Sequence, residues 1–145
     1  PLGVGGAGGA EQELRAMAGP TVEFRGRLDE AEVHELMARC KGFILAGSED
    51  FGISAVEAQA AGRPVSAFGA GGALESVIPG ETGLFFSERT AESLMTAIRQ
   101  FDTVAWSPER ARANAERFSK ERFQREIMEE VRAVLLQKQL SRESA

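Results

Sequence analysis

The sequence predicts an α/β fold with a Rossmann-like parallel sheet and helices on both of its faces. Short apolar runs recur at residues 22–24, 43–46, 65–68 and 84–86, and stretches of helical periodicity separate them. Strands of a parallel sheet are buried on both faces and therefore read as continuous apolar runs. A length of 145 residues with 43% hydrophobic residues suits one domain with a core of its own.

Composition narrows the function classes. The formal net charge of −5 argues against a nucleic-acid partner. The single cysteine, Cys40, excludes a disulfide within the chain, and with His34 as the only histidine there is little material for a zinc site or a Cys/His catalytic pair. No apolar run approaches eighteen residues and the start does not resemble a signal peptide, so we expect a cytoplasmic protein.

The first residues are rich in glycine. Gly3, Gly5 and Gly8 formally match the G-x-G-x-x-G dinucleotide fingerprint, and Glu23 lies near the usual distance of the ribose-binding acid. That fingerprint needs a strand before it, and only two residues precede Gly3. We therefore interpret residues 3–9 as a loop, with a dehydrogenase as a minor alternative.

Two helices are expected around the first complete strand. Residues 11–18 form a helical segment that Gly19 and Pro20 end. Asp29 and Glu32 have the spacing of a capping box for the second helix. Its apolar stripe consists of Val33, Leu36, Met37 and Cys40. His34 falls off this stripe and should face solvent, and Cys40 is interpreted as a small apolar residue.

The central stretch, residues 43–64, predicts a strand, a tight loop and a helix. The apolar strand ends at Gly47, two acids follow at Glu49 and Asp50, and helical periodicity starts at about Gly52. Ligands of α/β sheets bind beyond the carboxyl ends of the strands, which is where this loop lies. The free N–H groups at the helix start favour a phosphate or a sugar hydroxyl.

Glu57 interrupts a small, apolar helix surface, eight positions after Glu49. Removing a carboxylate from water costs free energy. Such an acid therefore either has a partner or ligand or lies on the exposed side of its helix.

The remaining elements follow the same alternation. The strand at residues 65–68 leads into four small residues, 69–72, which allow close approach of another surface. Thr90 and the sequence Ser107-Pro108-Glu109 are helix starts. The last helix is expected over about residues 119–139, with an apolar face of Phe123, Ile127, Val131, Val134 and Leu135.

Two segments together resemble a known family. They are EDFGISAVEAQAAGRPV at residues 49–65 and GAGGALESVIPGETGLFF at residues 69–86. They resemble the signature of group 1 (family four) glycosyltransferases, which are retaining enzymes of the GT-B fold whose acid-x7-acid pattern corresponds to Glu49 and Glu57. The resemblance covers residues 22–86 and continues more loosely to the end.

The resemblance implies that residues 1–145 are a single C-terminal, donor-nucleotide-binding domain of a two-domain GT-B enzyme. The N-terminal, acceptor-binding domain would then be a removed part or a separate chain. The enzyme would transfer a hexose such as mannose or glucose, and the isolated domain would not be active alone. The resemblance implies no cofactor and no metal, only a UDP- or GDP-sugar as donor. Peripheral membrane association of a full-length enzyme stays open.

The resemblance also implies roles for particular residues. Glu49 would be catalytic, holding sugar hydroxyls and stabilising positive charge on the ring, while Glu57 would accept hydrogen bonds from the ribose hydroxyls. A helix start, a turn after the second strand and a loop of small residues would complete the donor site. These further donor-binding residues are Phe51, Gly52, Ile53, Gly26, Arg27, Leu28, Gly71 and Gly72.

Three other interpretations remain open at this point. One is another GT-B-like enzyme, such as a nucleotide-sugar epimerase or a phosphorylase, although Lys41 lacks a supporting motif for the pyridoxal phosphate of the latter. The second is a non-catalytic module that binds nucleotide sugar. The third is a purely structural α/β domain, which would leave Glu49 and Glu57 without a role.

Overall fold

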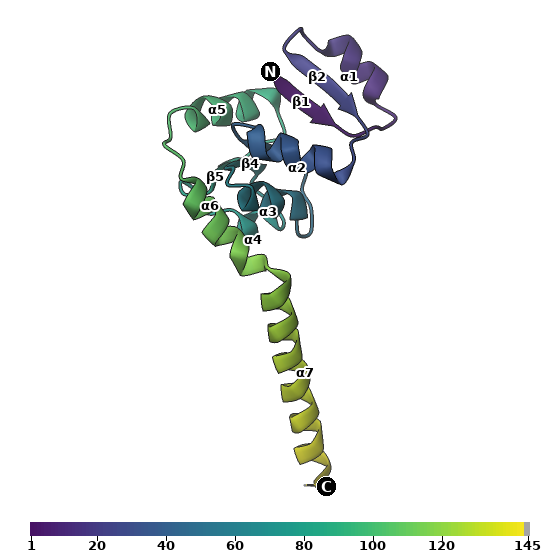
Figure 1. The fold of residues 1–145 in the computed structure, drawn as a ribbon, viewed down its shortest axis with the longest axis vertical. Helices are drawn as coiled ribbons and strands as arrows, with labels where there is room; N and C mark the ends of the chain where they lie inside the picture. The colour runs from purple at the N-terminus through teal and green to yellow at the C-terminus, as the bar shows by residue number, and fades with distance from the viewer. Residues whose placement is uncertain (144–145) are drawn as a thin grey trace. The chain divides into compact units, whose positions relative to one another are not determined.

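The computed structural model describes residues 1–143, which fall into two compact units. The first is Pro1–Cys40 and the second begins at Lys41. Both contain parallel strands with helices between them (Figure 1), which confirms the predicted α/β class. The hydrogen-bonded ladders belong to two sheets, one in each unit.

The N-terminal unit contains β1 (Leu2–Gly5), α1 (Glu11–Met17), β2 (Val22–Gly26) and α2 (Glu30–Arg39). β1 pairs with β2 in parallel, with Leu2 opposite Val22. The interpretation of residues 3–9 as a loop is therefore wrong for Gly3–Gly5. Ladder hydrogen bonds use only backbone groups, so a strand can include glycines, and the chain leaves it at Gly6, whose φ is +116°.

The predicted start of α2 is confirmed as a capping box. The Asp29 carboxylate accepts from the Glu32 N–H at 2.8 Å, and the Glu32 carboxylate accepts from the Asp29 N–H at 2.9 Å. His34 is exposed, as its place off the apolar stripe predicts, and Met37 is buried. Cys40 is only half-buried, and its Sγ donates to the Met37 carbonyl.

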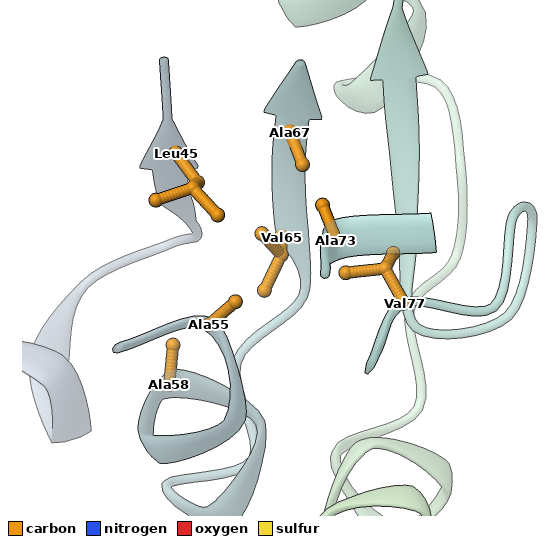
Figure 2. Packing of buried hydrophobic residues seen from close by; sticks show 7 residues of the cluster. All are labelled: Leu45, Ala55, Ala58, Val65, Ala67, Ala73 and Val77. Atoms are coloured by element: carbon orange, nitrogen blue, oxygen red, sulfur yellow. The ribbon is translucent and has the colours of Figure 1, made fainter. Parts of the chain in front are cut away.

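The C-terminal unit is built on a sheet in the order β3 (Phe43–Leu45), β4 (Val65–Phe68), β5 (Gly83–Phe86). Helices α3 (Ile53–Ala60) and α4 (Ala73–Ser76) follow β3 and β4. The core cluster of this sheet and these helices consists of Leu45, Ala55, Ala58, Val65, Ala67, Ala73 and Val77 (Figure 2). Four of these seven are alanines, which leave short separations between the helix and sheet backbones.

Four further helical segments complete this unit. They are α5 (Ala91–Phe101), α6 (Pro108–Ala115), the 3-10 turn η1 (Glu116–Phe118) and α7 (Lys120–Glu143). The predicted caps are present, because the Thr90 hydroxyl accepts from the Ser93 N–H and the Ser107 hydroxyl accepts from the Arg110 N–H, both at 3.2 Å. α6 packs against α3.

α7 differs from the expectation at its end and on its apolar face. The helix continues to Glu143, beyond the predicted end at residue 139. The predicted face is apolar but exposed, from 44% for Val131 to 64% for Phe123. Periodicity identifies such a face but cannot say what covers it. Among the described residues, no helix combines the length and the apolar character that crossing a membrane requires.

Candidate functional site

Two loops meet at the carboxyl edge of the β3–β4–β5 sheet. We call residues 46–52, between β3 and α3, the acid loop, and residues 69–72, between β4 and α4, the glycine loop. β3 and β4 are parallel neighbours, so their carboxyl ends lie at the same edge. The Gly72 N–H donates to the Glu49 carbonyl oxygen at 2.9 Å, which joins the two loops directly.

Gly71 and Gly72 have no space for a side chain. A Cβ at Gly71 would lie 2.3 Å from the Glu49 carbonyl oxygen, and one at Gly72 would lie 2.4 Å from the Phe51 carbonyl oxygen. Gly71 also has φ +61°, in the left-handed region that favours glycine. The sequence predicted that the glycines allow close approach, and the surface they approach is the acid loop.

The acid loop ends in the uncapped N-terminus of α3. Gly52 is the N-cap residue, with φ +74° and no side-chain cap, and its carbonyl accepts from the Ala55 N–H at 3.0 Å. Within the described residues, the N–H groups of Gly52 and Ile53 have no acceptor. These donors at the positive end of α3 can bind an anion.

Glu49 and Glu57 are both exposed. In the described part of the chain, neither carboxylate has a hydrogen bond or an ion pair. Glu57 lies between the buried residues Val56 and Ala58, on the outer side of α3, so the desolvation cost considered from the sequence does not arise. Both carboxylates remain available to accept hydrogen bonds from a ligand.

Gly26, Arg27 and Leu28 belong to the N-terminal unit and form the turn after β2. Gly26 has φ +66°, and its carbonyl oxygen accepts from the Gly6 N–H at 2.7 Å. Leu28 is half-buried against Gly5, while Arg27 is exposed.

The N-terminal unit also has a hollow of about 550 Å³ beside its glycine-rich turn. Gly8, Gly9, Glu11, Gln12 and Arg15 line it. Its two charged side chains, Glu11 and Arg15, pair with each other at 2.8 Å.

Two other polar features bear on the alternatives from the sequence. Lys41, considered for pyridoxal phosphate, pairs with Asp102 at 2.6 Å. Among residues 1–143, no three His, Cys, Asp or Glu side chains lie close enough together to hold a metal ion.

One neighbour of the acid loop was not predicted from the sequence. Phe118, at the end of η1, contacts the Phe51 ring edge to face, with ring centroids 5.7 Å apart and an interplanar angle of 70°. Phe118 is far from Phe51 in sequence and is no part of the quoted segments, so no local pattern connects the two residues.

Comparison with known proteins bears on the family of this chain. Residues 4–118 match the family described as glycosyl transferases group 1. A curated glycogen synthase of Mycobacterium tuberculosis is 38% identical over 98 residues, which is 66% of this chain and 24% of that protein. A D-inositol 3-phosphate glycosyltransferase of Gordonia bronchialis is 40% identical over 76 residues, covering 50% of this chain and 17% of that protein. The chain thus spans about a quarter or less of these relatives.

Solved structures show the same fold. The lipopolysaccharide outer core galactosyltransferase WaaB in its apo form has a TM-score of 0.75 at 16% identity, covering 89% of this chain and 40% of that chain. HepE of Anabaena, solved with UDP and glucose, has a TM-score of 0.69 at 28% identity, covering 90% of this chain and 40% of that chain. With a family match over most of its length and structural neighbours of the GT-B fold, this chain belongs to the group 1 glycosyl transferases.

Proposed function

We propose that this chain is the donor-binding domain of a retaining glycosyltransferase, which transfers a hexose from a nucleoside diphosphate sugar to an acceptor hydroxyl. One observation carries the proposal. At the carboxyl edge of the sheet, the acid loop and the glycine loop are joined around a free helix N-terminus, and the exposed carboxylates of Glu49 and Glu57 lie on that loop and helix. Family membership and the UDP and glucose present in the HepE structure support it.

The helix N-terminus is suited to the diphosphate. The N–H groups of Gly52 and Ile53 lack acceptors among the described residues and lie at the positive end of the α3 dipole. Phe51 precedes them in the same loop, and its backbone is held against Gly72. Fixed donors of this kind stabilise the negative charge that grows on a departing diphosphate without reorganising.

The two carboxylates have different tasks in this proposal. Glu57 accepts hydrogen bonds from the ribose hydroxyls, and Glu49 holds sugar hydroxyls and stabilises the positive charge that develops on the ring. The bond from the anomeric carbon to the diphosphate breaks, and its electron pair leaves with the diphosphate. The acceptor oxygen forms the new bond to the anomeric carbon on the same face, and its proton passes to the departing diphosphate. A second, acceptor-binding domain supplies the acceptor.

UDP and GDP, added separately to this chain, test which base the donor carries. We expect the nucleotide that binds to shift the backbone amide resonances of Gly26, Arg27 and Leu28 and of residues 49–57. Inorganic phosphate at equal concentration should shift only the α3 N-terminus, since it lacks a ribose and a base. Absence of binding by both nucleotides at millimolar concentration would contradict donor binding by this chain.

A further inference from the structure

A buried polar network lies behind α3. Gln59 is fully buried two positions after Glu57, and its Nε2 donates to the carbonyls of Ala55 at 3.1 Å and Ser76 at 2.9 Å. Asn114 of α6 is also buried, and its Nδ2 donates to the Gln59 Oε1 at 2.6 Å and the Ser76 carbonyl at 2.8 Å. All four amide N–H groups of the two side chains are thus used, which fixes α6 against α3 and the end of α4.

The network extends from α6 to the surface. The Asn114 Oδ1 accepts from the Arg117 Nη1 at 2.8 Å. The Arg117 guanidinium lies over the Phe118 ring, 5.4 Å from its centroid, in the geometry of a cation–π contact. Arg117 thus connects Asn114 to the Phe118 ring.

Phe118 makes the connection to the acid loop, because its ring meets the Phe51 ring at a centroid distance of 5.7 Å. Phe51 is 42% exposed and its backbone contacts Gly72. The acid loop is thus held from two sides, by the glycine loop through backbone contacts and by η1 through an aromatic pair.

We propose that Asn114, Arg117 and Phe118 are positioning residues that hold the acid loop, and with it Glu49, in its place beside the glycine loop. The effect of this positioning on activity rests on the proposed function, since a displaced Glu49 would no longer reach the sugar hydroxyls. Its structural part can be tested without any ligand. An exposed loop with few buried apolar contacts opens easily, so the loss of one aromatic contact should be measurable there.

The Gly72 N–H reports on this arrangement directly, because its acceptor is the Glu49 carbonyl. In Phe118→Ala, hydrogen exchange at Gly72 should become about fivefold faster, which corresponds to the loss of one aromatic pair. The Phe43 N–H, bonded to the Pro64 carbonyl at 3.0 Å in the sheet, is the internal reference and should not change. Phe118→Tyr keeps the ring and should restore the exchange rate of the unaltered chain.

Phe123→Ala is the matched control, because Phe123 is 64% exposed on α7. It should leave the exchange at Gly72 unchanged. Arg117→Met, which removes the guanidinium and keeps an apolar stem, should accelerate exchange at Gly72 in the same direction as Phe118→Ala. The proposal is overturned if Gly72 exchanges at the same rate in Phe118→Ala, or if Gly72 and Phe43 accelerate equally.

A UDP titration of the same variants separates this inference from the proposed function. The affinity for UDP should fall about fivefold in Phe118→Ala and recover in Phe118→Tyr, if the aromatic pair is coupled to the site. If the unaltered chain binds neither UDP nor GDP, the proposed function fails, while the exchange rates at Gly72 still decide whether Phe118 positions the loop.

Discussion

At the level of single residues, Gly72 occupies a position with no space for a side chain. A Cβ there would lie 2.5 Å from the Phe51 Cα and 2.6 Å from the Asp50 carbonyl oxygen, and these are backbone atoms that cannot move alone. Gly72→Ala should therefore lower the free energy of unfolding by about 1–3 kcal/mol, as expected for overpacking. Urea denaturation measures it.

Gly69→Ala is the control from the same loop, since its Cβ would meet the Phe85 Cβ at an ordinary 3.5 Å. It should change stability by less than about 1 kcal/mol. Equal stability losses in the two variants would contradict the contact between the glycine loop and the acid loop.

A substitution at Glu57 should change the affinity for UDP without changing the stability of the fold. Its carboxylate is exposed and, within the described residues, has no hydrogen bond or ion pair. Glu57→Gln should therefore leave the unfolding free energy within about 0.5 kcal/mol of the unaltered chain. It should weaken UDP binding by about tenfold, since hydrogen bonds to a charged group are worth more than those to a neutral one.

Calorimetric titration with UDP tests this prediction for Glu57. Glu92→Gln, an exposed acid in the first turn of α5, is the control and should bind UDP normally. A normal UDP affinity in Glu57→Gln would rule out the ribose-binding role of Glu57.

At the level of elements, the start of α6 carries a pH-dependent cap. Hydrogen bonding to its own backbone N–H, and then to the Ser107 hydroxyl, holds the pKa of Glu109 below its ordinary value. A lowered pKa in the folded state means that the carboxylate stabilises the fold above its ordinary pKa. This contribution is lost as the pH falls through the lowered value.

The expected result is a melting temperature that falls with acidification more in the unaltered chain than in Glu109→Gln, which has no carboxylate to protonate. Thermal melts from neutral to acidic pH measure the difference between the two chains. A difference that stays constant across this range would contradict the cap.

α7 has an apolar stripe that is exposed and not buried. Its apolar stripe has helical spacing, yet Ile127 and Leu135 are 45% and 55% exposed. The predicted stripe of α2 is covered only in part, since Met37 is buried while Leu36 is 37% exposed. Spacing determines which side chains share a face, whereas burial requires an opposing surface in the same unit.

At the level of the whole molecule, ligand binding should increase the stability of the folded state. A ligand that binds only the folded state stabilises it by an amount that depends on its concentration relative to Kd, about 2.7 kcal/mol at one hundred times Kd. UDP should therefore raise the melting temperature of the unaltered chain. It should do so less for Glu57→Gln at the same concentration, which a thermal-shift experiment can check. Equal shifts for the two chains would place the nucleotide away from Glu57.

The local elements could be predicted because their causes are local. The capping box of Asp29 and Glu32 and the Ser107–Pro108 helix start require only residues within one turn. The strand Val65–Phe68 was predicted with its observed bounds, because a buried parallel strand is apolar on both faces. The first strand was missed, since the pattern G-x-G resembles a loop and only pairing with β2 shows that it is extended.

The α/β alternation, the helix caps, the family resemblance and the acid pair Glu49 and Glu57 could all be recognised in the amino-acid sequence. Folding was needed to show that Gly72 bonds to Glu49, that Gln59 and Asn114 share a buried network, and that the Phe118 ring contacts the Phe51 ring. The difference lies in the range of the interactions. Caps and periodicity act within a turn or a strand, whereas these contacts join segments far apart in the chain, whose proximity is created by packing α3, α6 and η1 together.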